Sequence, residues 1–161
     1  MTLDGERKPK RILRSVETLA ESAPADAAKW IAVLPLGATE QHGPHLPFET
    51  DSLIAEAVVE RLIERLPDAA PVVFLPVEDV GYSPEHMHVA GTKSLEWDQA
   101  VRRWIRIGEQ AHRSGIRKLV MLNAHGGNSP LMTIVATELR TRFNMLAVAT
   151  SWTRFGLPDG V

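Results

Sequence analysis

The chain has 161 residues, of which 44% are hydrophobic and 24% are charged, so it is long enough for one domain with a hydrophobic core. Its net charge of -2 gives no indication of a nucleic-acid or membrane partner, and no apolar stretch is long enough to span a bilayer. The charged N-terminus lacks the apolar segment of a signal peptide, so we expect a cytoplasmic protein. Because there is no cysteine, any metal must be held by histidine and carboxylate side chains.

The first half of the chain predicts an arm, two helices and two strands. Residues 1–14 are expected to form a loose arm, and Ser15 is placed to begin a short helix. Residues 30–37 form a continuous apolar run that ends in glycine, which is typical of a buried strand. Residues 50–66 carry apolar side chains at helical spacing, and residues 70–81 predict a second strand that Pro76 is expected to close.

The second half continues the alternation of helices and strands. Residues 95–115 predict a long amphipathic helix, and residues 117–128 predict a third buried strand that breaks at two glycines. Residues 129–143 predict a helix with Ser129 as its N-cap and a proline in its first turn. Residues 145–152 predict a fourth strand.

This order of elements predicts an α/β fold. After the short leading helix it reads β-α-β-α-β-α-β, and the strands are solidly apolar rather than alternating, which indicates a mainly parallel sheet covered on both faces. We therefore expect residues 1–161 to form a single domain, a three-layer αβα sandwich. No predicted helix follows the fourth strand to cover it, so we interpret the domain as C-terminally incomplete.

Three polar motifs follow three successive predicted strands. The first is "GATEQHGPHLPFETD", with Glu40, His42 and Asp51. The second is "SPEHMH" at residues 83–88, and the third is "NAHGGN", with His125. Ligands of open parallel sheets bind outside the carboxyl ends of the strands, so these motifs are expected to meet on one rim.

Each motif alone also has a plain structural interpretation. Glu40 and His42 could be a solvated glutamate and a hydrogen-bonding histidine, and Asp51 could be a helix N-cap. Residues 83–88 could be a polar turn, and His125 a structural loop histidine. Two histidines and two carboxylates on one predicted rim instead favour metal binding.

The chemistry of these side chains narrows the metal and the reaction. Imidazole and carboxylate ligands without thiolate suit Zn²⁺, Mn²⁺ or Fe²⁺. More ligands than one ion can use favour two metals with a bridging water, whose pKa is lowered while a substrate carbonyl is polarised. The expected reaction is hydrolysis of an amide-like C–N bond, and the glycines after His125 would let a substrate approach the backbone.

Taken together, "PLGATEQHGPHLPFETD", "GYSPEHMHVAGTKSL" and "LNAHGGN" resemble the creatininase (creatinine amidohydrolase) family, from about Trp30 to Trp152. The resemblance implies an αβα sandwich, two divalent metal ions (Zn, Mn or Fe), a small-molecule amide-like substrate and a homohexamer. Members of this family act on creatinine, on formamide-type intermediates, on cyclic sugar ketones and on the mycofactocin precursor peptide, and the sequence does not select among these substrates.

The resemblance also implies a role for each matching residue. Glu40 and His125 look like terminal ligands of one metal, His42 looks like a ligand of the second, and Asp51 looks like the bridging carboxylate. The loop expected to line the substrate pocket contributes Ser83, Glu85 and His86. His45 also matches a recurrent family position, where a hydrogen bond that shapes the loop is as good an explanation as a functional role.

Gly127 departs from the creatininase pattern, because creatininase itself has a glutamate two residues after the third-strand histidine. The branches with "HGGN" are more similar and take their remaining carboxylate from a later His-Ala-Gly-x-x-Glu motif, which does not occur before Val161. A metal ligand and a general acid/base are therefore expected beyond Val161, and creatinine is disfavoured as the substrate.

Three function hypotheses remain. The first is a metal-dependent amidohydrolase of creatininase type, and the second is a truncated, inactive relative with a binding or regulatory role. The third, a nucleotide-binding α/β domain, is disfavoured because no G-x-G-x-x-G and no Walker lysine are present.

Overall fold

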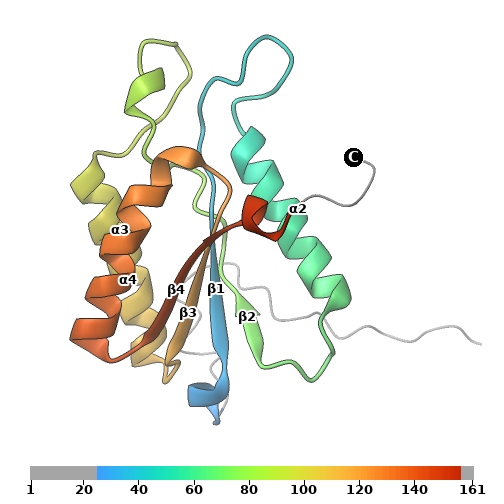
Figure 1. Ribbon diagram of the computed structural model, residues 1–161, viewed down its shortest axis with the longest axis vertical. Coiled ribbons are helices and arrows are strands. Elements are labelled where there is room, and N and C mark those ends of the chain that lie inside the picture. The colour runs from blue at the N-terminus through green and yellow to red at the C-terminus, as the bar shows by residue number, and fades with distance from the viewer. Residues whose placement is uncertain (1–24, 157–161) are drawn as a thin grey trace, which may run out of the picture.

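A computed structural model describes residues 25–156 of the chain, and the predicted arm at residues 1–14 and the helix at Ser15 lie outside the described residues (Figure 1). The strands are β1 (Ile31–Leu36), β2 (Val72–Phe74), β3 (Lys118–Asn123) and β4 (Leu146–Ser151). The α-helices are α2 (Thr50–Arg65), α3 (Trp97–Arg113) and α4 (Ser129–Phe143). Short 3-10 turns are η1 (Ala27–Lys29), η2 (Pro84–His86), η3 (Gly126–Asn128) and η4 (Trp152–Phe155).

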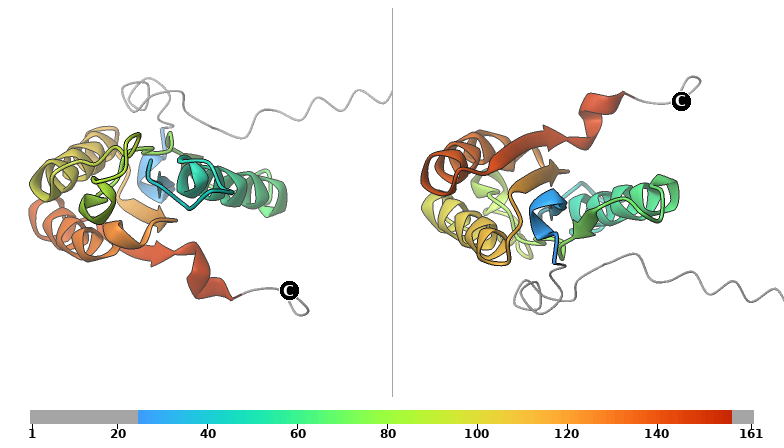
Figure 2. Two further views of the ribbon diagram at one scale, coloured as in Figure 1. Left: turned by 90° about the horizontal axis from the view of Figure 1, so that it is seen from above. Right: turned by 90° about the horizontal axis from the view of Figure 1, so that it is seen from below.

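The four strands form one parallel sheet in the order β2-β1-β3-β4. The central strand β1 is buried along nearly its whole length, because helices cover both of its faces. Figure 2 shows the three layers, with α3 and α4 side by side on one face of the sheet and α2 on the other. The predicted parallel α/β fold and its order of elements are therefore confirmed.

Two apolar cores hold these layers together. The larger core lies between the sheet and the α3–α4 pair, where Trp104, Met121 and Leu139 are fully buried. The smaller core lies under α2, where Val59 packs with Phe74. Each fully buried side chain of this size stabilises the fold by about 1.5–3 kcal/mol relative to an exposed one. The two cores therefore fix the positions of the carboxyl ends of the strands, where the polar loops begin.

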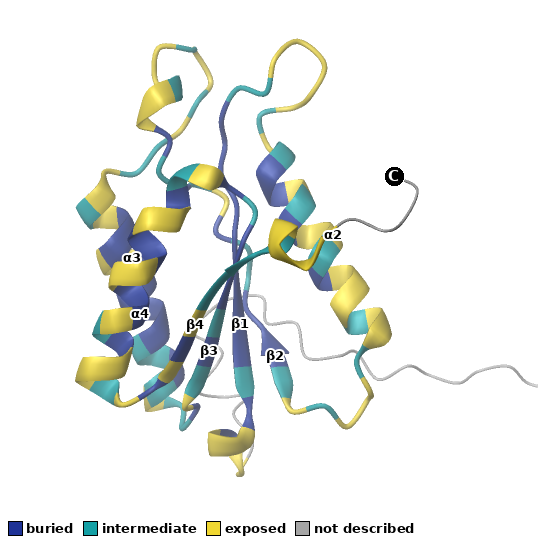
Figure 3. Cartoon of the chain, viewed as in Figure 1, coloured by how far each residue is buried: buried dark blue, intermediate teal, exposed yellow. Residues whose placement is uncertain are grey.

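The face of β4 on the α2 side is open (Figure 3). Leu146 is 59% exposed and Val148 is 40% exposed, whereas the intervening Ala147 is 4% exposed under the opposite helical layer. A surface hollow of about 490 Å³ lies between α2 and η4. Its apolar lining comes from Ile54, Ala57, Val58, Leu62, Trp152 and Phe155. The sheet is thus covered on both faces at β1 and on one face at β4.

The second strand ends before Pro76, the residue expected to close it, and so is shorter than residues 70–81. Only Val72–Phe74 form regular pairs with β1, and Pro76 cannot donate to a strand ladder because it has no N–H. The chain nevertheless stays beside β1, since the N–H of Glu78 donates to the carbonyl of Pro35 at 3.0 Å. The third strand likewise ends early, at Asn123, and the glycines beyond it form η3.

The predicted N-cap of α4 is wrong, and the alternative interpretation of Asp51 as an N-cap does not hold. Ser129 is the first residue of α4, and Asn128 is the N-cap, but the Asn128 side chain makes no capping bond because it is used in longer-range contacts. Asp51 lies in the first turn of α2 after the N-cap Glu49, so its carboxylate points to other partners. A carboxylate is still favourable there, since the helix dipole is positive at its N-terminus.

Within residues 25–156, no helix has the length and apolar character needed to cross a membrane.

Candidate metal centre

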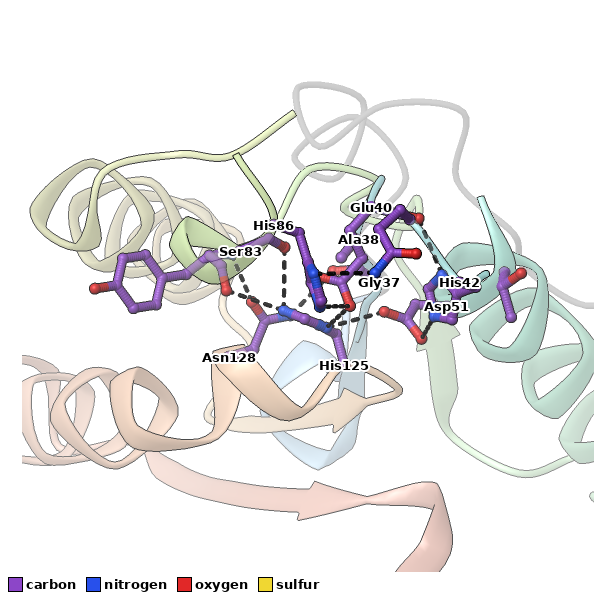
Figure 4. Close-up of polar contacts among 12 residues, drawn as sticks. Gly37, Ala38, Glu40, His42, Asp51, Ser83, His86, His125 and Asn128 are labelled. Carbon is purple, nitrogen blue, oxygen red and sulfur yellow. Dashed lines mark hydrogen bonds and ion pairs between the residues drawn. The ribbon is translucent and has the colours of Figure 1, made fainter. Parts of the chain in front are cut away.

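The polar loops meet at the carboxyl ends of the parallel strands, as the topology requires. Glu40 and His42 follow β1, Asp51 opens α2, and His125 follows β3 (Figure 4). The loop after β2 contributes the turn Pro84–His86. The structure thus brings together residues from four separate segments of the sequence.

Asp51 lies between the two histidines. Its Oδ1 is 3.2 Å from Nε2 of His42, and its Oδ2 is 2.9 Å from Nδ1 of His125 (Figure 4). The aspartate is only 6% exposed, so these short contacts are made largely out of water. A carboxylate whose two oxygens face two different imidazoles has the geometry expected of a group that bridges two metal ions.

The backbone sets the orientation of His42. Its Nδ1 is 3.0 Å from the carbonyl oxygen of Glu40. Because a carbonyl only accepts, Nδ1 donates to it, and this bond turns Nε2 toward Asp51. Metal-binding histidines are commonly held in this way, by a backbone carbonyl at the nitrogen that does not bind.

His125 has the opposite orientation. Its Nε2 is 2.9 Å from the Tyr82 carbonyl oxygen, to which it donates, and 3.2 Å from Oγ of Ser83. Its Nδ1 therefore faces the carboxylates of Asp51 and Glu40, the latter at 3.4 Å. The two histidines thus present different ring nitrogens to the same cluster.

The pKa of His125 is raised above its ordinary value of 6.5. Burial by itself would lower this pKa, because it disfavours the charged imidazolium. The contact with Asp51, the bond to the Tyr82 carbonyl and the charges of Glu40 and Asp51 outweigh burial. Without metal, a protonated His125 therefore supplies positive charge that a bound cation would replace.

Glu40 is buried and incompletely bonded. It is 6% exposed, and its Oε2 is buried with no hydrogen-bond partner among residues 25–156. An unsatisfied buried carboxylate oxygen is costly unless a cation or donor reaches it. Glu40 belongs to two groups of possible ligands, one with His42 and Asp51 and the other with Glu85 and His125. Within each group, one ligand atom of each residue lies within 4.8 Å of those of the others. The donors and the unsatisfied oxygen fit divalent ions that prefer nitrogen and oxygen ligands.

The other residues of the predicted pocket loop differ in exposure. Ser83 is fully buried behind His125, whereas Glu85 is exposed and His86 is partly exposed. The Nε2 amide of Gln41 lies 3.4 Å from Nδ1 of His86, and Nε2 of His86 lies 3.8 Å from Oε1 of Glu40. His45 is exposed on its loop.

Two asparagines that our sequence analysis did not single out hold the loops in place. The Asn123 side chain donates to the His125 carbonyl and accepts from the His125 N–H. The fully buried Asn128 donates to the Gly37 carbonyl at 3.0 Å and accepts from the Tyr82 N–H at 3.0 Å. The loops after three strands are thereby tied together. The only sequence signal was that asparagines flank His125 in "NAHGGN".

Gly37 explains how Asp51 reaches the centre. A Cβ at this position would lie 2.5 Å from Oγ and 2.7 Å from Cα of Ser52. The absence of a side chain therefore lets the first turn of α2 pack directly against the end of β1. The Ser52 hydroxyl donates to the Ala38 carbonyl at 3.3 Å and fixes the same approach.

The fold and the site define an α/β protein with a carboxylate–histidine cluster at the carboxyl ends of its strands. The family model described as "Creatininase: Creatinine amidohydrolase" matches residues 17–160, and the chain belongs to the creatininase family.

Several curated relatives are similar over the same region. The mycofactocin precursor peptide peptidase of Mycobacterium tuberculosis (strain H37Rv) is 39% identical over 114 residues, which are 67% of this chain and 45% of that protein. The creatinine amidohydrolase of Pseudomonas putida is 32% identical over 108 residues, 64% of this chain and 40% of that protein. The chain thus spans less than half the length of these relatives.

Solved structures of creatininases have the same fold. One crystal structure of creatinine amidohydrolase gives a TM-score of 0.75 at 26% identity, covering 94% of this chain and 61% of that chain. A structure described as "Creatininase Mn" gives 0.69 at 27% identity, covering 89% and 56%. A glutamate-to-glutamine creatininase variant of "Zn-Zn type" gives 0.70 at 28% identity, covering 91% and 62%.

Proposed function

We propose that this chain carries the metal centre of a creatininase-type hydrolase that cleaves an amide-like C–N bond. The observation that carries the proposal is the position of Asp51, whose two oxygens each face a differently oriented histidine. When bound, two divalent ions supply a water of lowered pKa and polarise the carbonyl to be attacked. The protein residues would position the ions.

Each residue has a role that its contacts support. Glu40 and His125 would hold one ion as terminal ligands, His42 would hold the other, and Asp51 would be a ligand of both. The backbone carbonyls of Glu40 and Tyr82 hold the imidazoles so that Nε2 of His42 and Nδ1 of His125 face the ions. Such outer partners fix the tautomer and raise the basicity of the ligand.

The metal and substrate classes are supported by the relatives. Creatininase structures described as manganese and Zn–Zn forms favour Mn²⁺ or Zn²⁺ here, and Fe²⁺ stays a prediction from the donor set. The relatives named peptidase and amidohydrolase have names that describe cleavage of amide-type bonds. We therefore propose an amide-like substrate. A homohexamer and a cytoplasmic location stay predictions from the resemblance and the composition.

The test is metal binding followed by hydrolysis. The purified chain is loaded with Mn²⁺ or Zn²⁺, and bound metal is counted by mass spectrometry of the desalted protein. Two ions per chain are expected, with loss of at least one in His42→Gln. The exposed His45→Gln is the matched control and should retain both ions. Release of amine is then measured with creatinine, a formamide and a short peptide. A wild-type chain that retains no metal would contradict the proposal.

A further inference from the structure

The position two residues after His125 cannot supply a carboxylate in this chain. A Cβ at Gly127 would lie 2.2 Å from the Tyr82 carbonyl oxygen and 2.5 Å from Nε2 of His125. Both atoms are already engaged, because this nitrogen donates to this carbonyl at 2.9 Å. The bond that orients His125 therefore occupies the space that a side chain at 127 would need.

A carboxylate reaches the cluster from another loop. Glu85 lies in η2, and its carboxylate oxygen, an oxygen of Glu40 and a ring nitrogen of His125 are all within 4.8 Å of one another. This spacing is what a single divalent ion needs, since ligand distances near 2 Å place two ligands about 3–4 Å apart.

The turn that carries Glu85 is anchored on both sides. The N–H of His86 donates to the Ser83 carbonyl at 3.2 Å, and the N–H of Ser83 donates to Oγ of Ser94 at 2.8 Å. The side chain of His86 packs toward Glu40 at 3.8 Å. The backbone is thus held beside the cluster, while the exposed Glu85 side chain is free to adjust to a ligand.

A second observation points independently to a cation at this place. Glu40 is more than nine-tenths buried, and its Oε2 has no hydrogen-bond partner among residues 25–156. A carboxylate oxygen left in this state is satisfied by a positive charge that enters the cluster. Glu85 is the further carboxylate grouped with Glu40 and His125 around that position.

We propose that Glu85 is a further protein ligand, beside Asp51, of the ion that Glu40 and His125 would hold, and that it supplies there a carboxylate that position 127 cannot. The inference rests on the proposed function, because it requires metal at this centre. It changes the role expected for Glu85 from substrate contact to metal ligand. It also makes the two ion positions unequal, since the group formed by Glu40, His42 and Asp51 does not include Glu85.

The test compares Mn²⁺ binding to the full chain by calorimetry and electron paramagnetic resonance in wild type, Glu85→Gln and Glu56→Gln. Glu56 is an exposed glutamate on α2, so its variant makes the same chemical change away from the centre. Glu85→Gln is expected to weaken one of the two sites at least about tenfold, while Glu56→Gln leaves both unchanged. In His42→Gln the ion that remains should still depend on Glu85, so the double variant should bind it at least about tenfold more weakly than His42→Gln does.

The outcomes separate this inference from the proposed function. If wild type binds two ions and Glu85→Gln binds both with unchanged affinity, Glu85 is not a ligand, although the metal centre stands. If wild type binds no Mn²⁺, both proposals are overturned. Thermal unfolding of the metal-free variants checks that each one folds. Because Glu85 and Glu56 are exposed, replacing either one should leave the unfolding temperature unchanged. Loss of one site in a folded Glu85→Gln protein supports the inference.

Discussion

Asp51 and His125 lie 2.9 Å apart, from Oδ2 to Nδ1, and this contact joins the first turn of α2 to the loop after β3. Neither residue reaches the contact through local structure alone. Close packing at Gly37 brings α2 to the sheet, and the Tyr82 carbonyl sets the direction of the imidazole. The contact between Asp51 and His125 therefore depends on three loops. Measurements on this pair test whether the loops at the carboxyl ends of the strands are correctly packed.

Replacing Asp51 with asparagine should abolish tight metal binding at both positions. The change removes the charge that faces both histidines but keeps the size of the side chain. We expect the affinity for Mn²⁺ to fall at least about 100-fold by calorimetry, because a bridging ligand serves two ions. Asp98→Asn is the matched control, since Asp98 also lies in the first turn of a helix, α3. Equal losses in the two variants would contradict a bridging role.

The metal-free protein should lose stability as the pH rises through the folded-state pKa of His125. This pKa is raised above 6.5, so protonated His125 stabilises the folded state fully below the unfolded-state pKa, and the contribution disappears at higher pH. The measurement is the free energy of urea unfolding between about pH 6 and pH 9 in the presence of a chelator. His125→Gln should remove this part of the pH dependence. An identical pH profile in the variant would contradict the assignment.

The same protonation should appear in metal binding. If His125 is protonated before Mn²⁺ binds, binding must release that proton, because the lone pair on Nδ1 is needed for the metal. Calorimetry in buffers of different ionisation enthalpy measures the number of protons released. The number should be larger near pH 6.5 than near pH 9, and His125→Gln should reduce it. No dependence on the buffer would contradict binding through Nδ1.

The sequence predicted the sheet and the place of the polar cluster because both follow from general rules. Continuous apolar runs such as residues 30–37 indicate buried parallel strands, and polar residues after such strands share one rim. Glu40, His42, Asp51 and His125 meet for this reason. Their individual roles remain predictions, because the topology sets where side chains gather and not which ion each one binds.

The remaining details depend on contacts that periodicity does not encode. Asn128 rather than Ser129 precedes α4 as its N-cap residue, and its side chain bonds to distant backbone groups instead of capping the helix. The end of the second strand, by contrast, was predicted, because Pro76 lacks a donor. The approach of Glu85 to Glu40 depends on the path of an irregular loop, which no hydrophobic pattern specifies. Such loop geometry requires the three-dimensional structure.

Gly127 and its neighbour offer a sharp comparison. Gly127→Ala should displace the Tyr82 carbonyl or the His125 ring, because the new Cβ would lie within 2.5 Å of both. We expect destabilisation of about 1–3 kcal/mol and weaker Mn²⁺ binding, measured by urea unfolding and calorimetry. Gly126→Ala is the control, since a Cβ there would meet no atom within 4 Å. If the two alanines behave alike, close packing at position 127 is not what orients His125.

Asn128→Ala should loosen the loops without touching a proposed metal ligand. The change leaves the Gly37 carbonyl and the Tyr82 N–H without their buried partner, and each unsatisfied group costs about 1–3 kcal/mol. Because Tyr82 also orients His125, affinity for Mn²⁺ should fall about 10–100-fold even under conditions where the variant is fully folded. Asn144→Gly is the control, because Asn144 is an exposed residue with a φ of 52° that glycine adopts readily. Unfolding curves and metal titrations of the two variants check the expectation. A folded Asn128→Ala protein with wild-type affinity would mean that the bond from Nε2 of His125 to Tyr82 holds the ring without help from Asn128.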